Sequence, residues 1–343
     1  CCMPSSRPDT AFTDGVCSAC LHHDQQQTID WDARKQALYD LINSRPVNDS
    51  GYDCIVASSG GKDSYAQMID IIRLGFRPLL VTATTCSLTA IGRHNIDNFK
   101  QFASTIEVSP NATVRAKLNR LGLRLVGDVS WPEHVAIFTT PLRMAVALGI
   151  PLVFYGENPQ AQYGSPSPKA AQACQMTQRW VSEFGGFLGM RPCDLIGQEG
   201  LTEADLADYR MPSADAIART QVEAHFLGQY LGPWDSHRNA KRAAAVGMKQ
   251  EMPCEANWWA HENLDSALTG LHDHMMYRKY GYGRGCAQAS VDVRSGMARR
   301  DEALAWVLQN DGLFPHTYAG VTIAEVLDRI GMSLQEFKEV ERG

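Results

Sequence analysis

The chain has 343 residues, of which 44% are hydrophobic and 20% are charged, so disordered and fibrous classes are excluded and about two globular domains are expected. The 32 lysines and arginines against 38 aspartates and glutamates leave a formal net charge of −6, which disfavours a surface that attracts polyanions everywhere. The sequence has no apolar run long enough for a membrane span and no secretory leader pattern, so we expect a cytoplasmic protein.

Strand-like and helix-like hydrophobic patterns alternate through the first half of the chain. Polar, turn-rich residues 1–27 come first, and Asp30 is expected to cap a helix over 31–41. The patterns that follow predict strands at 54–57, 79–81, 106–108 and 152–155 and helices at 66–72, 112–121 and 133–148. Such βαβ alternation is typical of a doubly wound α/β domain with a parallel sheet.

Helical periodicity dominates beyond residue 165. It predicts helices at 204–209, 214–229, 264–280 and 303–308, and capping boxes at Thr322–Glu325 and Ser333–Glu336 mark two more helix starts. We therefore expect three parts: a small cysteine-rich lobe (1–27), an α/β domain (28–165) and a mostly helical region (166–343).

The segment Ser59-Gly60-Gly61-Lys62-Asp63-Ser64 lies between the first expected strand and the helix after it. Two glycines allow a tight turn and close approach to a ligand, and the amides of a helix N-terminus point towards anions. Lys62 and the hydroxyl groups of Ser59 and Ser64 can bind the oxygens of such an anion. Because neither a Walker A loop nor a Gly-x-Gly-x-x-Gly fingerprint is present, the segment predicts a pyrophosphate cradle of another kind.

This hexapeptide resembles the signature of the PP-loop ATP pyrophosphatases, which cleave ATP between its α and β phosphates to adenylate a substrate oxygen. The resemblance implies that the segment binds ATP through Ser59, Gly60, Gly61, Lys62, Asp63 and Ser64. It also implies that Lys62 and Asp63 take part in catalysis. We expect both side chains on an exposed turn, so that alanine substitutions would leave the fold intact.

Further blocks, spread over nearly the whole chain, resemble the N-acetyl-sugar amidotransferase family. They are Cys-x-Met-Pro at the N-terminus and the segments 15–20, 29–32, 156–160, 233–235 and 281–284. The resemblance implies an ATP-dependent enzyme of bacterial surface-polysaccharide biosynthesis, acting on lipopolysaccharide O-antigen or nonulosonic-acid precursors. It would adenylate the acetamido oxygen of an activated N-acetyl sugar, release pyrophosphate, and let ammonia displace AMP to leave an acetamidino group.

Carboxylates that follow expected strands suit a magnesium ion. Asp63 in the loop and Glu157 after the 152–155 strand are expected at carboxyl ends of strands, where open α/β sheets bind ligands, and both are candidate catalytic Mg²⁺ ligands. The alternatives are an acid favoured by the helix dipole for Asp63 and a solvated loop acid for Glu157.

Other polar residues are candidates for substrate binding. Hydrogen-bonding side chains follow the same strand, and two arginines could form bidentate contacts with the carboxylate or phosphates of an acidic sugar nucleotide. The substrate-binding set is Asn158, Gln160, Tyr163, Arg284 and Arg294. The alternatives are ordinary loop polarity and structural ion pairs. His134 could also reach the site, although a histidine on a helix face is the plainer interpretation.

Four of the ten cysteines fall in the first 20 residues, at Cys1, Cys2, Cys17 and Cys20. The Cys17-x-x-Cys20 pair with the N-terminal pair suits tetrahedral Zn²⁺, which would stabilise a lobe too poor in apolar residues to fold alone. The family resemblance implies that Cys1 is the second cysteine of a Cys-x-x-Cys-x-Met pattern that starts upstream, and Cys2 or His23 remains as another fourth ligand. A redox Cys-x-x-Cys is the competing interpretation.

The source of ammonia is not evident in the sequence. The segment before the loop is too short for an N-terminal-nucleophile glutaminase, and no Gly-x-Cys-x-Gly elbow occurs. The family resemblance implies a separate glutaminase, with partners similar to the glutaminase and cyclase subunits of histidine biosynthesis. The expected partners are therefore a nucleotide-activated or acidic N-acetyl sugar and an ammonia-supplying protein, with no membrane and no nucleic acid.

The alternative function is that of a tRNA-modifying PP-loop enzyme of the thiolation or lysidine type, which uses similar activation chemistry. Arg115, Lys117, Arg120 and Arg124 could form one basic face for RNA. A solvated helix side is the ordinary explanation for such a run.

Overall fold

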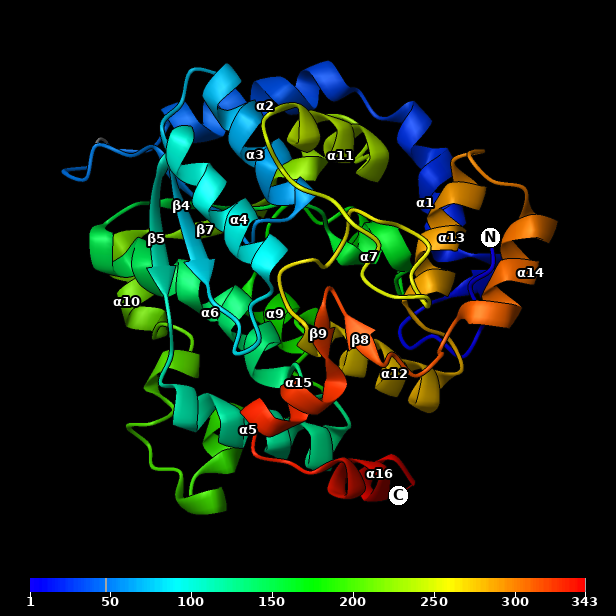
Figure 1. Cartoon of the computed structure of the whole chain (residues 1–343). Helices are drawn as coiled ribbons and strands as arrows, with labels where there is room; N and C mark the ends of the chain where they lie inside the picture. Colours follow the sequence, from blue (N-terminus) through cyan, green and yellow to red (C-terminus); the bar gives the residue numbers. More distant parts are fainter. Residues whose placement is uncertain (47, 343) are drawn as a thin grey trace.

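The computed structural model describes residues 1–46 and 48–342 (Figure 1). Its centre is a parallel sheet with the strand order β5-β4-β3-β6-β7, which confirms the expected α/β class. The strands are β3 (Cys54–Ala57), β4 (Pro78–Ala83), β5 (Ser104–Val108), β6 (Leu152–Tyr155) and β7 (Glu223–Phe226). The chain winds outwards from β3 to β5 and then returns to the other side of β3. The order therefore reverses between β3 and β6, which is where open α/β sheets bind ligands.

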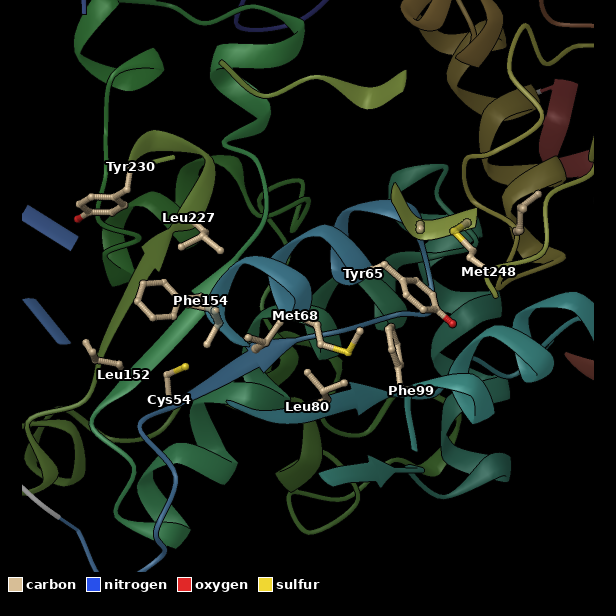
Figure 2. Packing of buried hydrophobic residues seen from close by; sticks show 14 of the residues in the cluster. Cys54, Tyr65, Met68, Leu80, Phe99, Leu152, Phe154, Leu227, Tyr230 and Met248 are labelled. Carbon is tan, nitrogen blue, oxygen red and sulfur yellow. The ribbon is translucent and has the colours of Figure 1, made fainter. Parts of the chain in front are cut away.

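Helices cover both faces of the sheet because successive side chains of a strand point to opposite sides. On one face, Cys54 and Val56 pack against α2 (Trp31–Asn43) and α3 (Lys62–Arg73). Figure 2 shows this layer, with Tyr65 and Met68 lying over the strands. On the other face, Ile55 packs in a cluster formed with α6 (Trp131–Leu148) and α9 (Gln178–Phe184).

The fifth strand, β7, was not expected, since the sequence pattern predicted one helix over 214–229. The structure has the short helix α10 (Ala214–Thr220), and Gln221 then takes a positive φ of 52° and ends it. β7 follows and pairs with β6, so that Ala224 lies beside Val153 and Phe226 beside Tyr155. Pairing and burial against β6 outweigh the helical periodicity here, and the sheet includes a strand from beyond residue 165.

The strands and helices predicted within the first 165 residues are present with shifted ends, but several short elements were not expected. Asp30 caps α2 by accepting a hydrogen bond from the Ala33 backbone N–H at 2.9 Å, as predicted. The segment 204–209 differs, because it holds only a 3-10 turn over Ala207–Tyr209. The remaining elements here are β1 (Phe12–Thr13), β2 (Val16–Cys17), α1 (Ser18–Gln25), α4 (Ala90–Asn98), α5 (Ala112–Val126), α7 (Pro159–Tyr163), α8 (Pro168–Ala171) and α11 (Ser236–Ala245).

The C-terminal part is mostly helical, with one small hairpin. Its elements are α12 (Leu268–Tyr280), α13 (Arg284–Arg294), α14 (Arg300–Asn310), β8 (Thr317–Tyr318), β9 (Val321–Thr322), α15 (Ile323–Arg329) and α16 (Leu334–Arg342). Both expected capping boxes form, because Thr322 and Ser333 exchange hydrogen bonds with Glu325 and Glu336. No helix within 1–46 or 48–342 is long and apolar enough to cross a membrane.

Many contacts join this helical part to the rest of the chain, and two of them involve the backbone at opposite sides. An isolated bridge pairs Leu88 with Ser266, so the segment before α12 lies against the loop between β4 and α4. At the other side, the N-terminus of the chain lies beside α13 (Figure 1), where the Cys2 backbone N–H donates to Ser290 Oγ at 3.0 Å. The N-terminal parts of α12 and α13 lie towards the carboxyl ends of the strands.

Candidate active site

The loop between β3 and α3 has a backbone that requires glycine. Gly60 has a positive φ of 87°, and a Cβ atom there would lie 3.0 Å from Ile96 Cγ1. Gly61 is the N-cap of α3, and the Ser59 backbone N–H donates to Ser64 Oγ at 3.0 Å. These features hold a tight turn that points the N-terminus of a twelve-residue helix towards the space beyond the strands.

A cavity of about 310 Å³ lies at the carboxyl ends of β3 and β6. Its polar wall is built from the loop, from the segment that follows β6, and from residues before and within α12 and α13. They include Ser58, Ser59, Gly61, Lys62, Asp63, Ser64, Glu157, His261, Glu262, Asp265, His272 and Arg284, and the start of α6 adds Ser130, Glu133 and His134. An apolar wall faces them, made of Val81, Ala83, Ile137, Phe138, Pro141, Tyr155 and Phe226. Such a combination of one apolar and one polar wall is typical of small-molecule sites.

Lys62 is buried, with 3% of its surface exposed, so the expectation that it lies on an exposed turn was wrong. Its Nζ lies 2.7 Å from Asp63 Oδ2 and 3.3 Å from Glu262 Oε1. Although burial opposes it, the charges of these two carboxylates raise the pKa of Lys62 above its usual value. Lys62 is therefore a fixed cation at the wall of the cavity.

Glu262 is the main site residue that sequence reasoning missed. Burial works against its ionisation, yet Lys62 and Arg284 lower the pKa of Glu262 to about 2. The carboxylate also accepts hydrogen bonds from Tyr163 Oη at 3.2 Å and from Gln288 Nε2 at 2.8 Å. Glu262 is 200 positions away from Lys62 in the chain, so no local pattern indicates this pair.

Two side chains from much later in the chain hold the Asp63 carboxylate in place. Its Oδ1 accepts hydrogen bonds from Trp234 Nε1 at 3.1 Å and from Asn239 Nδ2 at 3.0 Å. Trp234 lies in one of the blocks that carried the family resemblance, but its contact with Asp63 is visible only in three dimensions. The indole packs over Gly228, where a Cβ atom would lie 2.7 Å from Trp234 Cε3. A glycine at position 228 therefore allows Trp234 to reach Asp63.

Glu157 follows β6 and lines the cavity, as predicted for a carboxylate at the end of a strand. Burial, with the nearby charge of Asp63, raises the pKa of Glu157 to about 7. Within the described residues its side chain has neither a hydrogen bond to another residue nor an ion pair, whereas both oxygens of Asp63 are already engaged. The chemistry of Glu157 therefore fits a hard divalent cation, and Asp63 fits one only if Lys62 gives up its contact.

The five candidate substrate residues do not form one group. Tyr163 does not line the cavity but donates a hydrogen bond to Glu262, which does. Arg284 lines the cavity, and its Nη2 lies 3.0 Å from Asp273 Oδ1. Gln160 lines a second cavity instead. Asn158 is 1% exposed and acts as the N-cap of α7. Arg294 donates to the Gln162 backbone carbonyl at 2.9 Å and lies among the groups around Cys20.

Three of the four N-terminal cysteines form a cluster. The sulfur atoms of Cys1, Cys17 and Cys20 all lie within 4.8 Å of one another, and Cys1 Sγ is 3.4 Å from Cys17 Sγ. The thiol of Cys2 lies outside this group. A hydrogen bond from Cys17 lowers the pKa of Cys20 to about 5, so one thiolate is already favoured. Three convergent sulfur atoms fit Zn²⁺, whose bonds to sulfur are about 2.3 Å long.

Residues 256–343 match a family model described as the C-terminal domain of WbpG-like LPS biosynthesis proteins. The match supports a role in LPS biosynthesis. No curated protein was found to match the chain. The matched segment includes His261, Glu262, Asp265, His272 and Arg284, so it supplies one side of the cavity whose other side is the loop after β3.

Proposed function

We propose that the protein is an ATP-dependent amidotransferase of the PP-loop type that converts the acetamido group of an N-acetyl sugar into an acetamidino group. The observation that carries this proposal is the buried Lys62 between Asp63 and Glu262. It joins a glycine-rich anion loop to the segment that matches the LPS-biosynthesis family. One reaction, between a nucleotide bound at the loop and a sugar bound at the matched segment, then accounts for both sides of the cavity.

The phosphates of ATP would bind the loop after β3. The N-terminus of α3, the amide of Gly61 and the ammonium group of Lys62 are the anion-binding groups here. The adenine ring would lie against the apolar wall that includes Val81 and Phe138. With ATP bound in this way, its α-phosphate would point towards the part of the cavity lined by residues 261–284.

The chemical difficulty of the reaction is the poor reactivity of an amide. Attack of the amide oxygen on the α-phosphate releases pyrophosphate and gives an O-adenylated imidate, from which ammonia displaces AMP. Lys62 would stabilise the negative charge that develops as pyrophosphate leaves. A Mg²⁺ ion held by Glu157 and Asp63 would supply further charge neutralisation. Trp234 and Asn239 would keep the Asp63 carboxylate in position.

The sugar would bind on the side formed by the matched segment. Arg284 faces the cavity, and the bidentate geometry of a guanidinium suits the carboxylate or phosphate of an acidic sugar nucleotide. Tyr163 would position Glu262 rather than contact the sugar, because its hydroxyl is already used by that carboxylate. Ammonia would come from a separate glutaminase.

Zinc would have a structural role. Cys1, Cys17 and Cys20 supply three sulfur ligands next to α13, and the metal would brace the N-terminal segment against the helical part. The described residues place no fourth side chain in this cluster.

The competing tRNA-modifying function receives no support from the basic run of α5. Arg115 is buried and donates to the Thr84 backbone carbonyl at 2.6 Å. Arg120 and Arg124 both pair with Glu199, and Lys117 donates to the backbone carbonyl of the same residue at 2.7 Å. These charges are occupied within the chain, so they do not form an open face for RNA phosphates.

The test is product analysis with ATP and magnesium. The enzyme would be incubated with UDP-N-acetylglucosamine, its 6-carboxylate or bulk tRNA, each with and without ammonium chloride. We expect AMP and pyrophosphate to form only with a sugar nucleotide, and ammonium to be incorporated into it as an amidine detected by mass spectrometry. ADP and orthophosphate as products, or stimulation by tRNA alone, would refute the proposal.

A further inference from the structure

A second cavity of about 370 Å³ lies next to the proposed ATP cavity. Its wall combines residues near the N-terminus with others from the segment after α9 and from α12, including Arg7, Phe184, Gly186 and Met276. Two residues line both cavities, His134 of α6 and His272 of α12. These two imidazoles are therefore the partition between the two spaces.

One buried carboxylate lies beside both imidazoles. Asp128, in the turn between α5 and α6, is 3% exposed. Its Oδ1 lies 2.7 Å from His272 Nδ1 and its Oδ2 lies 3.1 Å from His134 Nδ1, while the two rings meet edge to face with centroids 4.9 Å apart. The hydrogen bond with Asp128 keeps the proton of His272 on Nδ1 and leaves Nε2 as the basic atom of that ring, whereas His134 Nδ1 makes no hydrogen bond within the described residues. The turn thus fixes one imidazole and places the second beside it.

The proposed reaction needs such a base and a path by which the nitrogen source reaches the site. ATP and a sugar would occupy the cavity of about 310 Å³, so the nitrogen source has to arrive by another path. In water near neutral pH this nitrogen is mostly ammonium, which has no lone pair and cannot attack carbon. A proton must therefore be removed close to the adenylated sugar, in a place shielded from bulk water.

We propose that the second cavity is the inlet for ammonia and that His134 and His272 are the bases that deprotonate ammonium at its inner end. This inference rests on the proposed amidotransferase function. One N–H bond of ammonium breaks, and its proton goes to an imidazole Nε2. The lone pair of ammonia forms the new C–N bond at the imidate carbon. The C–O bond to AMP then breaks, AMP leaves with the former amide oxygen, and the imidazolium returns its proton to solvent through the second cavity.

Within this scheme Asp128 is a positioning residue, because it touches the histidines and not the reacting atoms. Asp128→Asn would keep the shape of the turn but would no longer select the tautomer with a free Nε2. We expect this variant to lower the rate with saturating ammonium while the sugar-dependent half-reaction stays unchanged.

The experiment separates adenylation from amidation. His134→Gln and His272→Gln would be compared with the unmodified chain in pyrophosphate–ATP exchange that depends on the sugar nucleotide, without ammonium. AMP formation would then be measured with ammonium chloride and with hydroxylamine, a nucleophile that is mostly uncharged near neutral pH. In the double variant we expect ammonium-dependent AMP formation to fall about a hundredfold or more relative to exchange and to hydroxylamine-dependent AMP formation measured on the same variant.

A second pair of variants tests the route itself. Met276→Trp would narrow the second cavity, and we expect it to raise the KM for ammonium without a matching change in exchange. Met297→Trp is the control, since Met297 is 58% exposed and lines neither cavity. Thermal unfolding of each variant would be recorded to identify loss of folding.

Each other result overturns the inference. Equal loss of exchange and of both AMP-forming reactions in the histidine variants would make these residues part of the sugar site. Unchanged ammonium-dependent activity would remove their role as bases. The loss of one equivalent of a divalent metal would show that Asp128, His134 and His272 are instead a metal site, for which their atoms are close enough. Absence of sugar-dependent exchange in the unmodified chain would refute the proposed function itself.

Discussion

Replacing Lys62 by methionine tests whether the loop and the C-terminal segment depend on one buried charge. The change keeps most of the side-chain volume but removes the cation that lies 2.7 Å from Asp63 and 3.3 Å from Glu262. Breaking a buried ion pair by removing one partner costs about 3–5 kcal/mol, because the other charge stays desolvated. Asp63 keeps its bonds from Trp234 and Asn239 and is 20% exposed, so most of the cost falls on Glu262.

We therefore expect the free energy of unfolding of Lys62→Met to fall by about 3 kcal/mol at neutral pH, near the lower end of that range. Denaturant unfolding followed by tryptophan fluorescence would measure it. The double variant Lys62→Met/Glu262→Gln lacks the buried carboxylate that loses its lysine partner, and it should recover at least about 1 kcal/mol of the loss. A single variant as stable as the unmodified chain, or a double variant no more stable than the single one, would contradict this account.

The same pair predicts a pH dependence. In the unmodified chain Glu262 has its pKa lowered from 4.5 to about 2, so its stabilising contribution is complete above pH 4.5 and is lost as the pH falls towards 2. Without Lys62, burial would instead keep the carboxyl protonated more readily. The stability difference between the two proteins should thus be largest at neutral pH and shrink in acid.

Three further predictions concern other parts of the site. In Gly228→Ala the new Cβ atom would lie 2.7 Å from Trp234, so this side chain should be displaced. We expect slower AMP formation and a changed intrinsic tryptophan fluorescence. Unchanged fluorescence and an unchanged rate would contradict the contact. Cys17→Ser should lose zinc by elemental analysis and lower the melting temperature, whereas Cys193→Ser, at an exposed thiol, should do neither. Burial raises the pKa of Asp265 from 3.8 to about 6, so its ionisation destabilises the fold as the pH rises through this interval. Asp265→Asn should therefore be more stable than the unmodified chain above pH 6 and equal to it below pH 3.8, and a difference independent of pH would refute this origin.

Local features of the fold could be predicted from the sequence because local chemistry determines them. The Asp30 cap, the two capping boxes and the strand, loop and helix around Gly60 all depend on residues within a few positions of one another. β7 could not be predicted in this way, since the segment is a strand only because β6 offers it hydrogen bonds and a buried face.

The candidate site was predictable only in its local half. Lys62, Asp63 and Glu157 follow strands, and the parallel sheet brings their loops together. Glu262 and Trp234 join them from distant parts of the chain, and Arg294, chosen for its chemistry, lies near the cysteines instead. A single sequence contains no signal for such pairings, because the sequence separation of two residues says nothing about which of them meet.

The contact between Lys62 and Glu262 also has a consequence for synthesis of the chain. A ribosome makes the anion loop long before it makes residue 262, so a nascent chain carries a loop without its second carboxylate. Until the segment around Glu262 folds against the sheet, the proposed nucleotide cavity lacks one wall and the charge arrangement that we propose for catalysis. We therefore expect a chain truncated before residue 262 to form no AMP.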